Sequence, residues 1–342
     1  MNFWDYLIGG PLCTDYASDA IEILKKIGDA KEVTDSAMVE RVYSNPLAIE
    51  ILKRKGIELR GAPGIYCRIL VFFSGVGRGL RCLLMSPLAI VAGIYAHFKL
   101  VGIHYNLADI GNPKAKAGDD TVYDIMNKAN LRNGPIFQKT GKRVCIIAGK
   151  TNDLSACYYD SLHHVVSIPA CIGKTVARQN DTPCETVPGK DFGAATALAI
   201  AFHEMGHAEQ RKFLIFIFFA TPIAGIAALT FGLLALIFAT STILAVIAIA
   251  LVGIAILFAV TEPIIQFFYE RDASVRSIAN LIANGHITTE KTAKEAVFAL
   301  QLAASTYLLN TIKSLSERLS YVFALLSGMQ HKTASTIAPV PL

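Results

Sequence analysis

Two long apolar runs constrain this chain more than any other feature of its sequence. They cover residues 213–239 and 242–260, and only the uncharged pair Thr240-Ser241 lies between them. Each run is long enough to cross a bilayer as a helix, which takes about 20 apolar residues. The whole chain agrees with this, because 53% of its residues are hydrophobic and only 17% are charged, with a mean hydropathy of +0.45. We therefore expect a membrane protein with a transmembrane helical hairpin.

An H-E-x-x-H motif, His203-Glu204-Met205-Gly206-His207, lies just before the first apolar run. Residues four apart share one face of a helix, so both imidazoles can bind one metal ion, and Glu204 can reach its open water position. The Ala-rich residues 193–202 favour a helix that starts near Phe192 and can continue unbroken to Pro222. The alternative is a pair of packed histidines that bind no metal, which would leave the position of Glu204 between them unexplained.

Two histidines do not complete a catalytic zinc site, which takes three protein ligands and one open position. A hairpin returns the chain to the side from which it left, so the segment after Val260 can meet the motif. Glu270 and His207 both lie about 10 Å from the hairpin, at about 1.5 Å of helix rise per residue. We therefore expect Glu270 as the third ligand of one zinc ion. Asp272 is expected to accept an N–H from one of the ligand imidazoles without binding the metal itself. The alternative for this acidic segment is a solvated charge cluster.

The polar region before the motif predicts a small soluble lobe. Residues 121–130 indicate a helix, 144–148 a strand and 155–169 a β-hairpin. His163 and His164 lie beside the hairpin turn and are expected to be polar turn residues. The second hairpin strand is expected to be an edge strand that binds an extended peptide by strand addition; its residues are Val165, Val166, Ser167 and Ile168.

The N-terminal region contains a near repeat, with residues 20–28 resembling residues 48–56. Each copy predicts a short amphipathic helix with a basic end and a glycine C-cap. This pattern is more typical of an ordinary helical hairpin, and a surface for anionic lipid or a partner is the functional alternative.

The expected fold is mainly α-helical: a multi-span membrane protein with an H-E-x-x-H helix like that of zincins and a small hairpin or sheet in its soluble lobe. We divide it into an N-terminal accessory segment (1–82), a first membrane span (83–103), the soluble lobe (104–212), the transmembrane hairpin (213–261), a helical segment with the third ligand (262–328) and a disordered tail (329–342).

The run His203-Glu-Met-Gly-His-Ala-Glu-Gln210 resembles the H-E-V-G-H-A-x-Q of the YugP-like neutral zinc metallopeptidases. The likeness extends to Glu270-Arg-Asp-Ala-Ser274 after the hairpin, to residues 285–289 and 303–307, and to the hairpin strands, covering about residues 85–315. The resemblance implies a membrane zinc peptidase with His203, His207 and Glu270 as ligands and Glu204 as the catalytic carboxylate. Arg271 replaces an aromatic residue of the family pattern, and residues 1–82 have no counterpart in it.

These features together predict a zinc-dependent endopeptidase that acts near a bilayer surface on peptides or membrane proteins. One alternative is a catalytically inactive membrane scaffold that keeps the peptidase fold. Another is an intramembrane metalloprotease, which is disfavoured because the chain has no L-D-G and the motif precedes the apolar run.

Location and partners follow from charge and cysteine patterns. Arg211, Lys212 and Arg271 flank the hairpin and predict a cytoplasmic zinc site, while Arg78 and Arg81 point the other way. The net charge of +5 is mild. The sequence has no basic run interleaved with aromatic residues, so nucleic-acid binding is not expected. No cleavable signal peptide is expected. Seven cysteines without a C-x-x-C favour neither a disulfide framework nor a Cys-bound zinc. Four of them, at positions 145, 157, 171 and 184, share one segment and can pair if that segment is extracytoplasmic.

Overall fold

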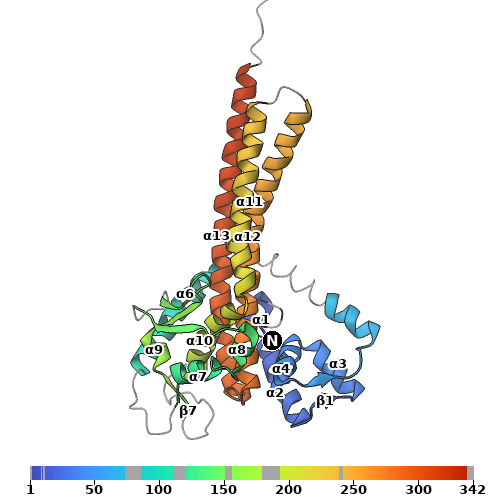
Figure 1. The fold of residues 1–342 in the computed structure, drawn as a ribbon, viewed down its shortest axis with the longest axis vertical. Coiled ribbons are helices and arrows are strands. Elements are labelled where there is room, and N and C mark those ends of the chain that lie inside the picture. The colour runs from blue at the N-terminus through green and yellow to red at the C-terminus, as the bar shows by residue number, and fades with distance from the viewer. Residues whose placement is uncertain are drawn as a thin grey trace, which may run out of the picture. The chain divides into compact units, whose positions relative to one another are not determined.

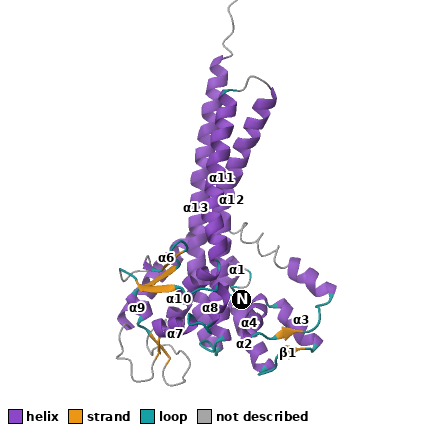
Figure 2. Ribbon diagram, in the orientation of Figure 1, coloured by secondary structure: helices purple, strands orange, loops and turns teal. Residues whose placement is uncertain are grey.

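Helices dominate the described chain (Figures 1 and 2). The computed structural model describes residues 2–336 except 9, 11, 74–85, 111–119, 151–155, 179–192 and 239–241. The chain forms two compact units. The first contains Met1–Arg211 and Tyr269–Tyr307, and the second contains Lys212–Phe268 and Leu308–Leu342. The mainly helical fold expected from the sequence is confirmed.

The first unit begins with short helices whose ends follow local sequence signals. They are α1 (Phe3–Ile8), α2 (Thr14–Ile27), α3 (Ser36–Ser44) and α4 (Pro46–Lys55). The Asn45 side chain accepts the first backbone N–H groups of α4, and Gly28 and Gly56 end α2 and α4 with positive φ angles of 59° and 67°. Both repeated segments therefore form the predicted helices. Strands β1 (Glu32–Val33) and β2 (Glu58–Leu59) pair in parallel, and residues 65–73 are helical.

The soluble lobe contains small helices around small sheets. Its helices are α6 (Ser86–Ile110), α7 (Val122–Ala129), α8 (Pro135–Thr140) and α9 (Ala170–Gly173). A capping box between Thr121 and Asp124 starts α7, which forms the helix predicted over residues 121–130. Strands β3 (Asp120–Thr121) and β7 (Val176–Arg178) pair antiparallel. Strands β5 (Tyr158–Asp160) and β6 (Val165–Ile168) form the predicted hairpin.

Strand β6 is the central strand of its sheet. The order is β4-β6-β5, in which β4 (Cys145–Ala148) pairs with β6 in parallel and β5 pairs with it antiparallel. Both hydrogen-bonding sides of β6 are therefore used. The interpretation of Val165, Val166, Ser167 and Ile168 as an edge strand is wrong, because β4, from earlier in the chain, covers the side that was expected to be free.

Helix α10 (Ala194–Glu209) lies at the core of the first unit. It packs against α7, α8, α9, β5, β6 and β7, and nearly all its side chains are buried. It ends at Gln210, and α11 (Arg211–Ile237) begins at the next residue. The prediction of one unbroken helix to Pro222 is therefore wrong. Gln210 turns its side chain to α12 (Thr242–Ala283), where it meets the backbone oxygen of Tyr269.

In the second unit, α11 and the first part of α12 form an antiparallel helix pair. A Cβ on Gly232 would touch Val252, and one on Gly225 would touch Phe258, so the contacts run in opposite directions along the two helices. Both helices are long and apolar enough to cross a membrane. Their large side chains point outward, as with Phe216 at 64% and Ile243 at 72% exposure. The predicted turn at Thr240-Ser241 lies outside the described residues.

Two other boundaries differ from the expectation. The apolar part of α6 covers only Pro87–Ile103 and is shorter than the two candidate spans. Helix α13 (Glu290–Thr336) runs past Met329, where a disordered tail was expected, because no proline interrupts it before Pro339. Residues 337–342 lie outside the described chain.

Candidate metal centre

Three potential ligand atoms converge inside the first unit. His203 and His207, one turn apart on α10, face Glu270 on α12. Glu270 Oε2 lies 3.1 Å from His203 Nε2 and 3.0 Å from His207 Nε2, and the two Nε2 atoms are 3.2 Å apart. All three residues are buried. The structure thus brings together the three ligands that the sequence predicts.

The donor set fits a zinc ion. Zinc bound tetrahedrally at about 2.0–2.1 Å holds its nitrogen and oxygen ligands about 3.3 Å from one another. The three separations of 3.0–3.2 Å are close to this value. Two imidazoles and one carboxylate are also a usual catalytic zinc set, because three protein ligands leave one position open.

His207 is oriented by Gln210. The Nδ1–H of His207 donates to Oε1 of Gln210 at 3.0 Å, which leaves Nε2 directed at Glu270. The Gln210 amide then donates to the backbone oxygen of Tyr269 at 3.0 Å and to Oδ2 of Asp272 at 2.6 Å. Asp272 therefore supports the site through Gln210 and does not accept the imidazole N–H that the sequence-based interpretation assigned to it.

His203 is oriented by Ser274. Its Nδ1–H donates to the Ser274 hydroxyl at 3.0 Å, and that hydroxyl donates to the backbone oxygen of Glu270 at 3.1 Å. In its neutral form each imidazole thus carries its proton on Nδ1 and presents Nε2 to the same point, as a metal ligand requires.

The helices α10 and α12 touch at Gly206. A Cβ at this position would lie 2.6 Å from the backbone oxygen of Ala273, so only glycine allows the two backbones to come this close. The close approach explains how one carboxylate from α12 reaches both histidines of α10.

Charges in the site depend on one another. Burial alone would lower the pKa of His207, but the Glu270 carboxylate outweighs it and raises this pKa to about 9. Burial raises the pKa of Glu204, the charge of Glu270 acts in the same direction, and the two histidines oppose it. Within the described chain the Glu204 carboxylate makes no hydrogen bond, so it is available to a water or a substrate.

The comparison with family models gives an independent assignment. Residues 191–326 match the model of the family described as "Putative neutral zinc metallopeptidase". Over these residues, which make up less than half of the chain, the sequence is similar to that family. The match contains the motif helix, the apolar helix pair and Glu270, and it confirms the resemblance inferred from the sequence. The comparisons with curated proteins and with solved structures returned no match.

Three further residues around this candidate metal centre had no role assigned from the sequence. Gln210 and Ser274 orient the imidazoles, and the Tyr307 ring stacks on His203 with centroids 6.0 Å apart and planes inclined by 12°. A spacing signal was available for two of them. Gln210 follows His207 by three positions and Ser274 follows Glu270 by four. Each therefore lies on the same helix face as one of the three predicted ligands.

Proposed function

We propose that the chain is a membrane-associated zinc-dependent endopeptidase with one catalytic zinc ion. The observation that carries the proposal is the convergence of His203, His207 and Glu270 beside a buried Glu204 that has no hydrogen bond within the described chain. The family match over residues 191–326 supports the same reaction class.

In this proposal the ligands hold the ion and Glu204 handles protons. A bound zinc ion would acidify a water and polarise the scissile carbonyl. Glu204 accepts a proton from the attacking water and returns it to the leaving amine. Its burial beside His203 and His207 suits this exchange, because a raised pKa brings a carboxylate closer to the working pH of a general base.

We infer that a peptide substrate adds to β5 rather than to β6. Strand β5 (Tyr158–Asp160) is an edge of its sheet within the described chain and packs against α10. Extended peptides commonly bind to enzymes and recognition domains by such strand addition. The substrates would be peptides or membrane-protein segments near the bilayer.

The bilayer itself is the second proposed partner. The outward-facing apolar residues of α11 and α12 favour lipid as their surroundings, because the core helix of a soluble protein buries such side chains. Arg211, Lys212 and Arg271 flank the hairpin and favour a cytoplasmic zinc site by the positive-inside rule.

The test separates catalysis from metal binding. The full chain is purified in detergent, its zinc content is measured by elemental analysis, and its hydrolysis of an unfolded protein is followed. Glu204→Gln should abolish hydrolysis and keep the zinc, whereas Glu270→Ala should lose both. Glu290→Ala is the matched control, because this exposed carboxylate on α13 pairs only with Lys294 among described ion pairs.

The competing function is a membrane scaffold that keeps the peptidase fold without activity. A zinc content near zero in the wild-type chain would favour the scaffold. Zinc near one ion per chain together with hydrolysis that Glu204→Gln abolishes would exclude it.

A further inference from the structure

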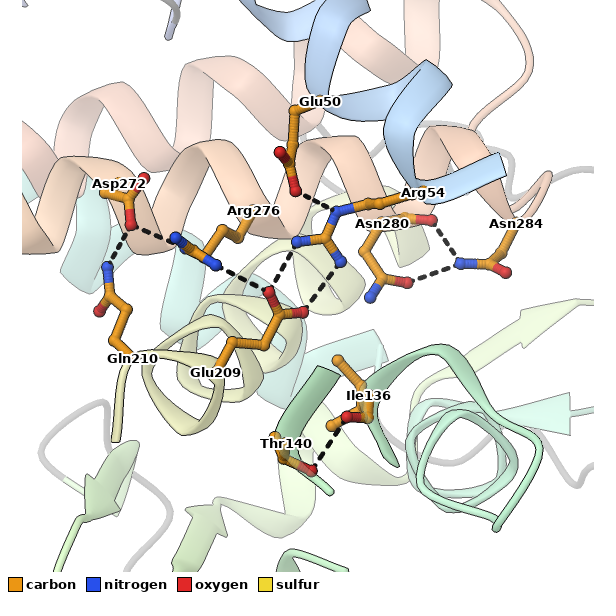
Figure 3. A network of polar contacts seen from close by, with 10 residues as sticks. All are labelled: Glu50, Arg54, Ile136, Thr140, Glu209, Gln210, Asp272, Arg276, Asn280 and Asn284. Carbon is orange, nitrogen blue, oxygen red and sulfur yellow. Dashed lines mark hydrogen bonds and ion pairs between the residues drawn. The ribbon is translucent and has the colours of Figure 1, made fainter. Parts of the chain in front are cut away.

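A line of charged and polar side chains connects the N-terminal segment to the helix that carries His207 (Figure 3). Arg54 on α4 donates from Nη1 to Oε1 of Glu209 at 2.9 Å and from Nη2 to Oε2 at 2.7 Å. Glu209 is the last residue of α10. A two-pronged guanidinium–carboxylate contact fixes orientation as well as distance, because both hydrogen bonds must form together.

The Arg54–Glu209 pair is buried. The two side chains are only 3% and 2% exposed. An ion pair at a protein surface contributes little to stability, whereas separating two charges of a buried pair is strongly destabilising. The position of α4 and the position of the end of α10 are therefore set together.

A second arginine extends the contact to α12 (Figure 3). Arg276 donates to Oε2 of Glu209 at 3.1 Å and to Oδ2 of Asp272 at 2.7 Å. Asp272 also accepts the amide of Gln210, the residue that orients His207. Glu209 thus joins α4 to α10 and α12, the two helices that supply all three metal ligands.

Other contacts hold the same N-terminal segment against α13. Gln301 on α13 donates to Asp5 at 2.5 Å and to the backbone oxygen of Leu12 at 3.2 Å, and the ring of Trp4 lies 6.3 Å from that of Phe298. This segment lies outside residues 191–326, the range that matches the zinc metallopeptidase family. The chain therefore supports the candidate metal site with an element that lies outside the residues that match the family model.

We propose that residues 1–60 are a positioning element of the metal centre and that Arg54 is the residue through which they act. Arg54 contacts neither the metal ligands nor the site of reaction. It holds Glu209, and so keeps the end of α10 where Gln210 can orient His207. The inference rests on the proposed function in one respect: it takes the bound metal to be zinc.

The test measures zinc affinity in the full chain carrying Arg54→Gln. Zinc is titrated against a chromophoric chelator in detergent, and the affinity should fall about 10- to 100-fold, the usual effect of losing support behind a metal ligand. Because the ligands themselves are intact, excess zinc should restore both occupancy and the hydrolysis rate. In metal-free protein, amide hydrogens of residues 203–210 should exchange faster than in the wild type, since the end of α10 is less restrained.

Arg41→Gln is the matched control. Arg41 is another arginine of the N-terminal segment, but its two carboxylate partners, Asp19 and Glu22, both lie within that segment. This variant should keep the wild-type zinc affinity and exchange rates. Arg54→Lys keeps the charge without the two-pronged contact, so it should give a smaller loss of affinity, and it serves as the test variant if Arg54→Gln does not fold.

Two results would overturn the proposal. One is wild-type zinc affinity and wild-type exchange in the Arg54 variants. The other is an equal loss in Arg41→Gln, which would mean that any weakening of the N-terminal segment has this effect. If the wild-type chain bound no zinc, the proposed function would fail, and hydrogen exchange in metal-free protein would still decide the role of Arg54.

Discussion

Gly206 on α10 and Ala273 on α12 lie so close together that position 206 has no room for a side chain. Gly206→Ala should push the helices apart, because the new Cβ would meet backbone and not a flexible side chain. We expect a loss of about 1–3 kcal/mol in unfolding free energy, typical of overpacking, and weaker zinc binding. Chelator competition and thermal unfolding measure the two effects.

Gly253→Ala on α12 is the control for this change, since an added Cβ there meets nothing within 4 Å. Stability and zinc affinity should stay at wild-type values. A Gly206→Ala variant that behaved like Gly253→Ala would show that the close approach does not set the ligand geometry.

Ser274→Ala should weaken zinc binding about 10-fold by removing the acceptor for His203 Nδ1–H. Ser277→Ala is the comparison, because Ser277 is equally buried on α12 and its hydroxyl donates to Ala199 on α10, away from the metal ligands. That change should reduce stability and leave zinc affinity unaltered. Equal zinc affinities in the two variants would contradict an orienting role for Ser274.

Zinc binding should release protons below about pH 9. In the metal-free protein the Glu270 carboxylate outweighs burial and raises the pKa of His207 to about 9, and a metal ligand must be the neutral imidazole. Apparent zinc affinity should therefore rise with pH up to about 9. Titration of weakly buffered protein with zinc, followed with a pH indicator, measures the release, and an affinity that did not change between pH 6 and pH 9 would count against this protonation state.

Acid should destabilise the first unit through His164. Burial, together with the charges of Arg211 and Lys142, lowers the pKa of His164 below its usual 6.5, and its Nδ1 accepts a hydrogen bond from Tyr159 at 2.7 Å. The unfolded chain then binds the proton more readily, so stability is present above pH 6.5 and is lost as pH falls below it. His164→Asn tolerates the positive φ of 57°.

The midpoint of thermal unfolding between pH 8 and pH 5 measures this effect. The wild type should lose more stability over the range than His164→Asn does. Parallel curves for the two proteins would mean that His164 does not carry the acid sensitivity.

The convergence of the three candidate ligands could be predicted from the sequence, because two of them are spaced one helical turn apart and the third follows a hairpin. His203 and His207 are spaced for one helix face, and the hairpin required by the apolar runs returns the chain to Glu270. The glycine caps of α2 and α4 and the Thr121–Asp124 capping box are also local signals, and the structure shows all of them.

What the sequence did not reveal depends on contacts between distant segments. The central place of β6 in its sheet depends on its parallel partner β4, which comes from an earlier part of the chain. The burial of Val166, Ser167 and Ile168 in the structure is typical of a central strand. The end of α10 at Gln210 follows from a side chain that binds Tyr269 and Asp272 across the fold. The ion pair between Arg54 and Glu209 joins residues 155 positions apart, which no spacing rule detects.

One helical turn of α12 supplies both the acidic ligand Glu270 and Ser274, the hydroxyl that holds His203. One turn of α10 supplies the two imidazoles. The arrangement is therefore small enough to transplant: two crossing helices with these four side chains and a glycine at the crossing contain the ligand set and one of its supports. A designed helix pair of this kind would show how much of the zinc affinity comes from the turns themselves and how much the rest of the chain adds.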